Sequence, residues 1–344
     1  MKHELYEDVI EAENSSQGFG IYRYNRVISV NKYLNNGKWI IGEGTDENIP
    51  FDCTSLIREE VKDWEKVEDI IRRFTIEGVK ITVKRVKRRL QHKDKICEED
   101  KIVNYVNFNG NLFAFTGSPR DIGAVLDYLK IETPRSLTRI WSIDRTAVIL
   151  DPEASAKVFH EIFSLLKGDS PRVKKNEKLF SDLSIYDNPE NPFSVGFYAF
   201  DDEGTKARKK EIIGDGYVLD YLGTLTTKLG TPGNGRGIIP KPDYFTLEIR
   251  RGDWGFQEMI EDTKNGILVL GAKSTEIVKN SVRLVPRESI LIGNGSIILR
   301  EIAIPFQEFL TIDGISRETK NVIIDEEHGG ISPFIRIHAR PILY

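Results

Sequence analysis

The segment Gly214–Gly237 reads GDGYVLDYLGTLTTKLGTPGNGRG and joins a predicted strand to a glycine-rich loop. Tyr217–Leu222 is rich in aromatic and β-branched residues, which favours a strand. The loop Gly230–Gly237 cannot be regular structure, because Pro232 lacks a backbone donor and the glycines permit positive φ. Such a loop exposes N–H groups that can hold an extended peptide, a carboxylate or a phosphate. A long hairpin turn is the alternative interpretation.

Further short motifs flank this loop in a fixed order. FDDEGT (200–205) lies upstream, and MIEDTKNGILV (259–269), LIGNG (291–295) and GISP (330–333) lie downstream. In this order the set resembles the carboxyl-terminal half of the TldD/PmbA family, once called modulators of DNA gyrase. The resemblance covers roughly residue 201 to the end of the chain. It implies a two-domain α+β protein that dimerises around a large cavity.

The resemblance also implies a division of labour between two kinds of subunit. In the paired bacterial system, the TldD-type subunit carries the metal and cuts unfolded or extended peptides, while its TldE/PmbA-type partner completes the assembly without the metal ligands. The glycine-rich loop is then expected to shape the peptide channel, with Gly233, Asn234 and Gly235 as substrate-binding residues that give shape and do not cleave. The edge of a nearby strand can add a peptide through backbone hydrogen bonds.

Composition sets broad limits on the class of protein. The chain has 344 residues, enough for two domains or one large one. Its net charge of −4 argues against polyanion binding by bulk charge, and two cysteines are too few for a disulfide framework or a zinc cage. The acidic start has no apolar core, and no apolar run approaches the ~20 residues of a membrane helix. We therefore expect a cytoplasmic protein.

The amino-terminal part, residues 1–148, is predicted to be an α+β domain. Residues 1–16 are expected to form a short helix or a loose arm, followed by a hairpin over 18–45 that turns at Asn36-Gly37. A helix is predicted over 56–74, and a β-rich piece over 102–115 turns at Asn109-Gly110. A further helix is capped by Ser118-Pro119 and ended by Thr133-Pro134. The boundary between residues 148 and 149 follows mainly from the family resemblance.

The carboxyl-terminal part, residues 149–344, is predicted to be β-rich. A strand over 141–150 leads into a helix that Asp151-Pro152 opens and Gly168 closes. Strands are expected over 193–200 and 217–222, a helix over 254–265, and short strands with glycine punctuation from residue 266 onward. The fold class is therefore α+β with two domains of TldD/PmbA type.

One residue pair on the helix after Asp151 suggests metal chemistry. In zinc hydrolases two histidines one helical turn apart bind the metal, and the Glu beside the first activates water. His160-Glu161 begins such a motif, but the common spacing H-E-x-x-H points to position 164, which is Ser164. The resemblance implies H-E-x-x-x-H for catalytic TldD-type members, and position 165 is Leu165.

The family's distant cysteine ligand is also missing from the late segment. Between residues 320 and 330 the only side chain of the His/Cys kind is His328. We therefore expect no catalytic residue, no metal ligand and no cofactor in this chain, with zinc only in a catalytic TldD-type partner. Whether the chain is itself an enzyme stays open.

Three functions are compatible with these residues. The first is a non-catalytic, TldE/PmbA-like subunit of a cytoplasmic metallopeptidase complex, bound to a TldD-type chain or to a second copy of itself and acting on extended peptides. The second is an active homodimeric peptidase with a divergent site that uses His160 with His328. The third is a nucleic-acid-associated regulator, suggested by the basic run Lys80–Arg89. A strand with a solvated basic face explains this run better, since no aromatics interleave to stack bases.

Overall fold

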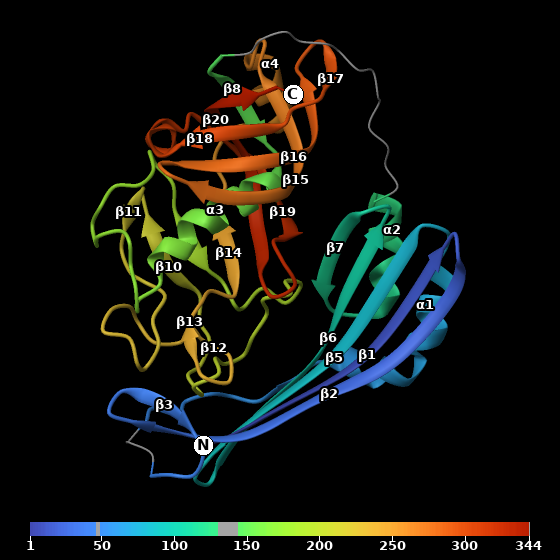
Figure 1. Ribbon diagram of the computed structural model, residues 1–344, viewed down its shortest axis with the longest axis vertical. Helices are drawn as coiled ribbons and strands as arrows, with labels where there is room; N and C mark the ends of the chain where they lie inside the picture. Colours follow the sequence, from blue (N-terminus) through green and yellow to red (C-terminus); the bar gives the residue numbers. More distant parts are fainter. Residues whose placement is uncertain (46–48, 130–143, 344) are drawn as a thin grey trace. The chain divides into compact units, whose positions relative to one another are not determined.

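The structure is a computed structural model that describes residues 1–45, 49–129 and 144–343. The chain divides into two compact units by its internal contacts. Unit 1 comprises Met1–Glu132, Pro189–Lys209 and Leu222–Phe245, and unit 2 comprises Thr133–Asn188, Lys210–Tyr221 and Thr246–Tyr344. Each unit has its own large β-sheet (Figure 1). The boundary between residues 148 and 149 stays a prediction about folding domains.

Unit 1 contains a seven-stranded sheet in the order β3-β2-β1-β5-β6-β4, with β7 paired to β6. The strands are β1 (Lys2–Ser15), β2 (Gly18–Asn35), β3 (Lys38–Ile41), β4 (Leu56–Ile57), β5 (Val79–His92), β6 (Lys95–Phe108) and β7 (Asn111–Thr116). The Asn36-Gly37 and Asn109-Gly110 turns are confirmed, and all four residues have positive φ. A separate short ladder joins β12 (Gly235–Arg236) to β13 (Lys241–Pro242).

Two helices, α1 (Val67–Phe74) and α2 (Ile122–Leu129), pack on one face of this sheet. Their buried residues Ile71 and Leu126 join Ile81, Val83 and Ile102 of the strands in one apolar core. The single helix predicted over 56–74 is wrong in its first half, where β4 precedes a 3-10 helix (Glu59–Lys66). The reason is tertiary: β4 pairs in parallel with β6 and holds the chain extended there. Ser118 caps its helix as predicted, accepting the Arg120 N–H, and the predicted end at residues 133–134 lies outside the described residues.

The expected helix or loose arm over residues 1–16 is wrong, because this segment is β1. The strand is paired along its length with β2 on one side and β5 on the other. Its carboxylates lie next to the basic strand β5, as in the ion pairs Lys80–Glu11 (2.8 Å) and Arg89–Glu4 (3.4 Å). Long-range pairing and this charge match override the weak local preference of an acidic segment.

Unit 2 contains an eleven-stranded sheet whose main path is β11-β10-β9-β14-β20-β18-β16-β15-β8. The strands are β8 (Thr146–Leu150), β9 (Ile185–Asp187), β10 (Lys210–Gly214), β11 (Tyr217–Val218), β14 (Thr246–Ile249), β15 (Ile267–Val278), β16 (Ser281–Leu291), β17 (Gly295–Ile297), β18 (Glu301–Pro305), β19 (Gly314–Ile323) and β20 (Gly329–Ile342). Because β8 pairs with both β15 and β20, the five strands β8, β15, β16, β18 and β20 close into a ring.

The helix α3 (Pro152–Phe163) packs against β15 and β20 and is followed by a 3-10 turn, Ser164–Leu166 (Figure 1). The predicted start is confirmed, since the Asp151 side chain accepts the Ala154 N–H at 2.8 Å. Close packing on β20 requires Gly330, where a Cβ would lie 3.0 Å from Ala156. A 3-10 helix (Phe306–Thr311) supplies Phe309, whose ring meets that of Phe159 on α3 edge-on.

In the carboxyl-terminal part, one predicted strand is absent and other predicted elements are shorter than expected. Residues 193–200 form no strand but a series of turns, in which Ser194 accepts the Phe197 N–H through its carbonyl. The predicted strand 217–222 is reduced to β11, and the predicted strand 141–150 to β8, with residues 141–143 outside the described part. The predicted helix 254–265 is α4 (Phe256–Asp262). The α+β fold class is confirmed.

No helix among the described residues combines the length and apolarity that a bilayer-spanning helix needs.

Candidate functional site

In unit 1 the glycine-rich loop and the acidic turn of the FDDEGT motif meet directly. The Asp201 carboxylate accepts the Gly235 N–H at 3.0 Å, and the Asp202 carboxylate accepts the Gly237 N–H at 2.7 Å. In return the Asp202 N–H donates to the Gly235 carbonyl at 2.7 Å. Asp201 also accepts the N–H groups of Glu203 and Thr205, which fixes the turn. The loop therefore binds carboxylates, but those of its own chain.

Glu203 is the third carboxylate of this turn and is buried against the same loop. One of its oxygens accepts the Trp39 indole N–H and the other the Leu225 backbone N–H, both at 2.7 Å. A Cβ at Gly235 would lie 2.6 Å from the Glu203 side chain. Glycine at position 235 is thus required by close approach of a side chain within the fold.

The predicted substrate-binding residues Gly233, Asn234 and Gly235 are all buried in unit 1. The Asn234 N–H donates to the Gly223 carbonyl at 2.9 Å, and Gly233 has a φ of +115° that favours glycine. Their effect on the shape of a peptide channel stays a prediction. In the structure they shape the acidic turn.

Buried basic side chains surround Asp202. The Arg88 guanidinium binds its carboxylate at 2.7 Å and also donates to the Phe200 carbonyl at 2.7 Å. The Lys32 ammonium donates to the Asp202 carbonyl at 2.8 Å, and the His3 imidazole lies 3.6 Å from the carboxylate. Burial opposes ionisation of Asp202, but Arg88 beside it lowers the pKa of its carboxyl to about 2.

A second buried acid, Glu99, lies on the other side of Arg88. Its carboxylate is 3.5 Å from Arg88, 3.2 Å from the Lys101 ammonium, and accepts the Ala199 N–H at 2.6 Å. Lys101 lies over the Tyr198 ring at 3.6 Å from its centre. We call the set His3, Lys32, Arg88, Glu99, Lys101, Asp201, Asp202 and Glu203 the buried charge cluster.

The buried charge cluster contains groups whose protonation is shifted in opposite directions. Burial raises the pKa of Asp201 to about 6, and burial together with the nearby Asp201 charge raises the pKa of Glu203 to about 7. Burial lowers the pKa of His3 to about 4 and that of Lys32 to about 8. At neutral pH His3 is therefore neutral, and its contact with Asp202 is polar and not ionic.

The basic run Lys80–Arg89 lies on β5, in the interior of the sheet. It is a strand as predicted, but its basic face is not simply solvated, because Arg88 is buried and Arg85 forms a two-point ion pair with Asp100 at 2.7 and 3.0 Å. Lys80 and Arg89 pair with carboxylates of β1. These ion pairs weaken the argument for a nucleic-acid surface.

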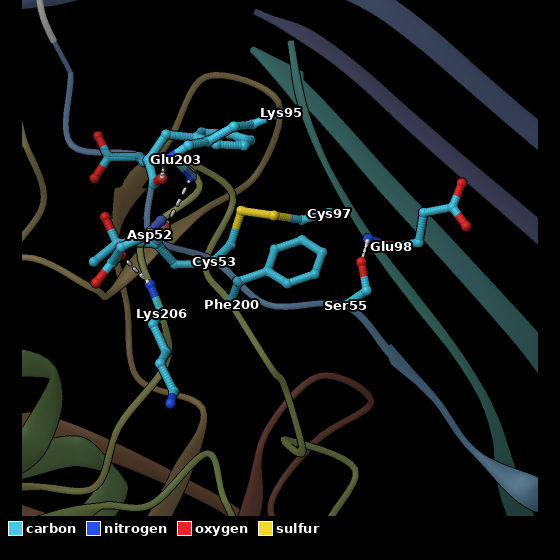
Figure 2. Close-up of a disulfide and its surroundings, with 12 residues drawn as sticks. Asp52, Cys53, Ser55, Lys95, Cys97, Glu98, Phe200, Glu203 and Lys206 are labelled. Atoms are coloured by element: carbon cyan, nitrogen blue, oxygen red, sulfur yellow. Dashed lines mark hydrogen bonds between the residues drawn. A yellow bond between two sulfur atoms is a disulfide. The ribbon is translucent and has the colours of Figure 1, made fainter. Parts of the chain in front are cut away.

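A disulfide joins Cys53 to Cys97 on β6, next to the acidic turn (Figure 2). These cysteines are 44 residues apart, and no local pattern in the sequence pairs them. Cys97 is buried with Phe51 and Phe200, and the Cys53 N–H donates to the Gly204 carbonyl at 3.1 Å. A Cβ at Gly204 would overlap the Phe51 ring. The disulfide thus attaches the segment before β4 to the turn that carries the acids.

In unit 2 the structure brings together the two histidines that the sequence singled out. His160 on α3 and His328, just before β20, have ring centres 5.8 Å apart. The His328 Nδ1 lies 2.8 Å from the Asp325 carboxylate, which also accepts the His328 N–H. Burial opposes ionisation of Asp325, but the hydrogen bond from His328 lowers its pKa to about 2.

The remaining residue of the motif, Glu161, is engaged with the fold. Its carboxylate accepts the Thr275 hydroxyl at 2.9 Å, and burial raises its pKa. Ser164 and Leu165 follow the end of α3, and the Ser164 hydroxyl donates to the Glu161 carbonyl at 2.6 Å. Both positions for a second helical ligand therefore lie in a 3-10 turn and hold side chains that do not bind zinc.

These donors do not fit a zinc site with three protein ligands. Among residues 1–45, 49–129 and 144–343, no three His, Cys, Asp or Glu side chains are arranged so that they could hold a metal ion. The geometry offers two neighbouring imidazoles, with one ring nitrogen of His328 bound to a carboxylate. We therefore derive no chemistry through a metal in this chain.

The structure combines two large sheets in an α+β fold with an incomplete H-E motif on α3. Residues 143–339 match the PmbA/TldA metallopeptidase C-terminal domain, which is more than half of the chain. The chain belongs to the PmbA/TldD family.

Relatives of known sequence carry metalloprotease names. Metalloprotease MJ0996 of Methanocaldococcus jannaschii is 30% identical over 169 residues, which is 44% of this chain and 37% of that protein. A metalloprotease of Methanothermobacter thermautotrophicus is 28% identical over 196 residues, covering 52% of this chain and 42% of that protein. The alignments thus span less than half the length of these relatives.

Solved structures share the fold over the whole chain. TldE from Thermococcus kodakarensis aligns with a TM-score of 0.71 at 15% identity, covering 100% of this chain and 96% of that one. A Thermotoga maritima protein described as a modulator of a DNA gyrase aligns with a TM-score of 0.70 at 13% identity, covering 99% and 95%. Identities this low support the fold and nothing further.

Proposed function

We propose that this chain is a non-catalytic, TldE/PmbA-like subunit of a metallopeptidase complex. The observation that carries the proposal is the end of α3, where His160-Glu161 is followed by Ser164 and Leu165 in a 3-10 turn. Glu161 is bound to Thr275 and half-buried, so it is poorly placed to activate a water. A catalytic site needs an exposed base and at least three ligands, and this segment supplies neither.

In this proposal the metal, zinc, belongs to a TldD-type partner, and the substrate is an extended or unfolded peptide. The match to the PmbA/TldA metallopeptidase C-terminal domain and the metalloprotease names of the relatives support a role of this chain in peptide cleavage. The buried charge cluster would keep the loop 230–237 rigid, so that it contributes shape without taking part in cleavage. Such rigidity is what a site needs when it positions a substrate for another subunit.

The proposal can be tested with three preparations: this chain alone, a TldD-type chain alone, and both together. We expect less than about 0.1 zinc per chain by elemental mass spectrometry for this chain, and no hydrolysis of an unfolded peptide. The mixture should cleave the peptide faster than the TldD-type chain alone. His160→Ala should leave the mixture's activity unchanged, with His338→Ala as a matched control. Metal near one per chain, or hydrolysis by this chain alone, would overturn the proposal.

A second candidate is an active homodimeric peptidase with a divergent metal site. The specific observation in its favour is that His160 and His328 lie side by side although 168 positions separate them in the sequence. This candidate predicts bound metal in the chain alone and its loss in the double variant His160→Ala/His328→Ala. Equal metal content and activity in the parent chain and the double variant would exclude it.

We further propose a cytoplasmic location. Disulfides are rare in the cytosol of mesophiles but persist in that of hyperthermophiles. A cytoplasmic location therefore requires a cytosol in which the Cys53–Cys97 disulfide is not reduced. Thiol labelling of the protein in freshly lysed source cells would show whether the bond exists there.

A further inference from the structure

Residues 49–55 form a surface segment of unit 1 that has neither helix nor strand and leads into β4. Of its side chains only Ile49 and Phe51 are buried, and Cys53 is half-buried. A segment with few buried apolar side chains opens locally more easily than the core strands do. Individual contacts therefore decide whether this segment stays in place.

Several of these contacts bind the segment to the acidic turn. The N–H groups of Asp52 and Cys53 donate to the Gly204 carbonyl at 3.2 and 3.1 Å. The Phe51 ring lies so close to Gly204 that an added Cβ would overlap it. The Asp52 carboxylate accepts the Lys206 N–H at 2.8 Å. These noncovalent contacts are of the kind that local opening breaks and remakes.

The Cys53–Cys97 disulfide ties the same segment covalently to β6 (Figure 2). Cys97 is only 3% exposed and packs with Phe51 and Phe200, whereas Cys53 is half-buried. A thiolate from solution therefore reaches the bond through the Cys53 sulfur, with Cys97 as the leaving group. Because access governs thiol–disulfide exchange, a bond with one accessible sulfur can open while the rest of unit 1 stays folded.

The acidic turn connects this attachment to the glycine-rich loop. The residues on both sides of Gly204 donate their N–H groups to the Asp201 carboxylate, at 3.0 and 2.9 Å. The same carboxylate accepts the Gly235 N–H at 3.0 Å. A continuous series of contacts therefore runs from Cys53 through Gly204 and Asp201 to Gly235, and a change at one end can reach the other.

We propose that the Cys53–Cys97 disulfide is a redox-sensitive latch: while it is closed, residues 49–55 stay on the acidic turn, and its reduction by a dithiol lets them detach and loosens the loop 230–237. A thiolate of the dithiol attacks the Cys53 Sγ, the bond to Cys97 breaks, and the Cys97 thiolate takes a proton from water. The second thiol then attacks the mixed disulfide, so that the dithiol ends as a cyclic disulfide and both cysteines end as thiols. The inference concerns the mobility of the loop and does not depend on which proposed function holds.

The first experiment treats the folded chain with dithiothreitol, without denaturant. Alkylation of a sample and mass spectrometry should find two thiols, while circular dichroism shows that the chain stays folded. Brief digestion of the unalkylated chain with chymotrypsin then locates the opening. The bond after Phe51 should be cut about tenfold faster or more in the reduced chain than in the oxidised chain, and before any cut after Tyr105 or Phe108 of β6.

Hydrogen exchange follows the effect to the loop. In the reduced chain the N–H groups of Asp52, Cys53 and Gly235 should exchange about threefold faster or more, at rates that low urea does not raise, because local opening exposes little surface. Amides of the β1–β5 ladder exchange through unfolding of the whole unit, so their rates should rise with urea.

The matched control is the variant Cys53→Ala/Cys97→Ala. It should exchange like the reduced parent chain whether dithiothreitol is present or not. Replacing dithiothreitol by its oxidised form should restore the protection of the parent chain and leave the variant unchanged.

Three results would overturn the proposal. The first is a disulfide that opens only after denaturant is added. The second is cleavage after Tyr105 or Phe108 that keeps pace with cleavage after Phe51, which would show that reduction unfolds the unit as a whole. The third is unchanged exchange of the Gly235 N–H, which would show that the opening does not reach the loop.

Discussion

Opening the Cys53–Cys97 disulfide is expected to destabilise unit 1 by about 4 kcal/mol. The bond closes a loop across 44 residues of sequence. The chain-entropy relation for a loop of this length gives an entropy loss of about 13 cal/mol/K in the unfolded state, or about 4 kcal/mol at 25 °C. Packing contributes little to the difference, because the reduced chain keeps both sulfur atoms beside Phe51 and Phe200.

The assay compares the oxidised chain with the same chain reduced in denaturant and refolded with a reductant present. Urea unfolding gives the two free energies, and hydrogen exchange of β5 and β6 peptides assigns the change to unit 1. The variant Cys53→Ala/Cys97→Ala is the control, since its stability must not respond to reductant. Mass spectrometry verifies the state of the bond in each sample.

A difference below about 1 kcal/mol between verified oxidised and reduced samples would refute this reasoning. It would mean that the reduced, unfolded chain already keeps residues 53 and 97 close together, so that the covalent link removes little further chain entropy.

Three further predictions concern the buried charge cluster and the turn beside it. Arg88→Met should lower the free energy of unfolding by about 3–5 kcal/mol, because it leaves the buried carboxylates of Glu99 and Asp202 without their shared cation. Urea unfolding at pH 7 measures this loss, and Arg88→Lys should recover only part of it. Gly204→Ala should lower the free energy of unfolding by about 1–3 kcal/mol, because the φ of Gly204 is +83° and the added Cβ overlaps the Phe51 ring. Gly37→Ala is the control for backbone strain alone, because Gly37 has a φ of +67° and open space around it. Equal losses of stability in both variants would exclude the overlap with Phe51. Burial raises the pKa of Glu203 from 4.5 to about 7, so the contribution of this residue to stability is fully present below pH 4.5 and is lost as the pH rises toward 7. Glu203→Gln should flatten the plot of unfolding free energy against pH over this range. An unchanged slope would show that other groups cause the pH dependence.

Sequence reasoning succeeded where local chemistry dictates the backbone. Asn-Gly pairs adopt positive φ without help from the rest of the fold, so both predicted turns are present. Asp151 caps α3 because its carboxylate reaches an N–H only three residues away. The ordered motifs around the glycine-rich loop indicated the family, and the match over residues 143–339 confirms it.

Sequence reasoning failed where distant segments decide the outcome. The acidic segment 1–16 has little strand character of its own, and it is a strand because β2 and β5 pair with its two sides. The turns over 193–200 have the composition of a strand, but the backbone of this segment instead supports the buried charge cluster, as when Glu99 accepts the Ala199 N–H.

The sequence by itself determined the α+β class, the tight turns and the absence of a second histidine at positions 164 and 165, because each depends on residues close together in the chain. It also indicated the family, because each short motif is recognised locally and their order needs no tertiary structure. Only the tertiary structure decided that the loop 230–237 binds the carboxylates of Asp201 and Asp202, that Cys53 meets Cys97, and that His160 lies beside His328. The physical reason is that burial and long-range pairing select among contacts that local sequence leaves equally available.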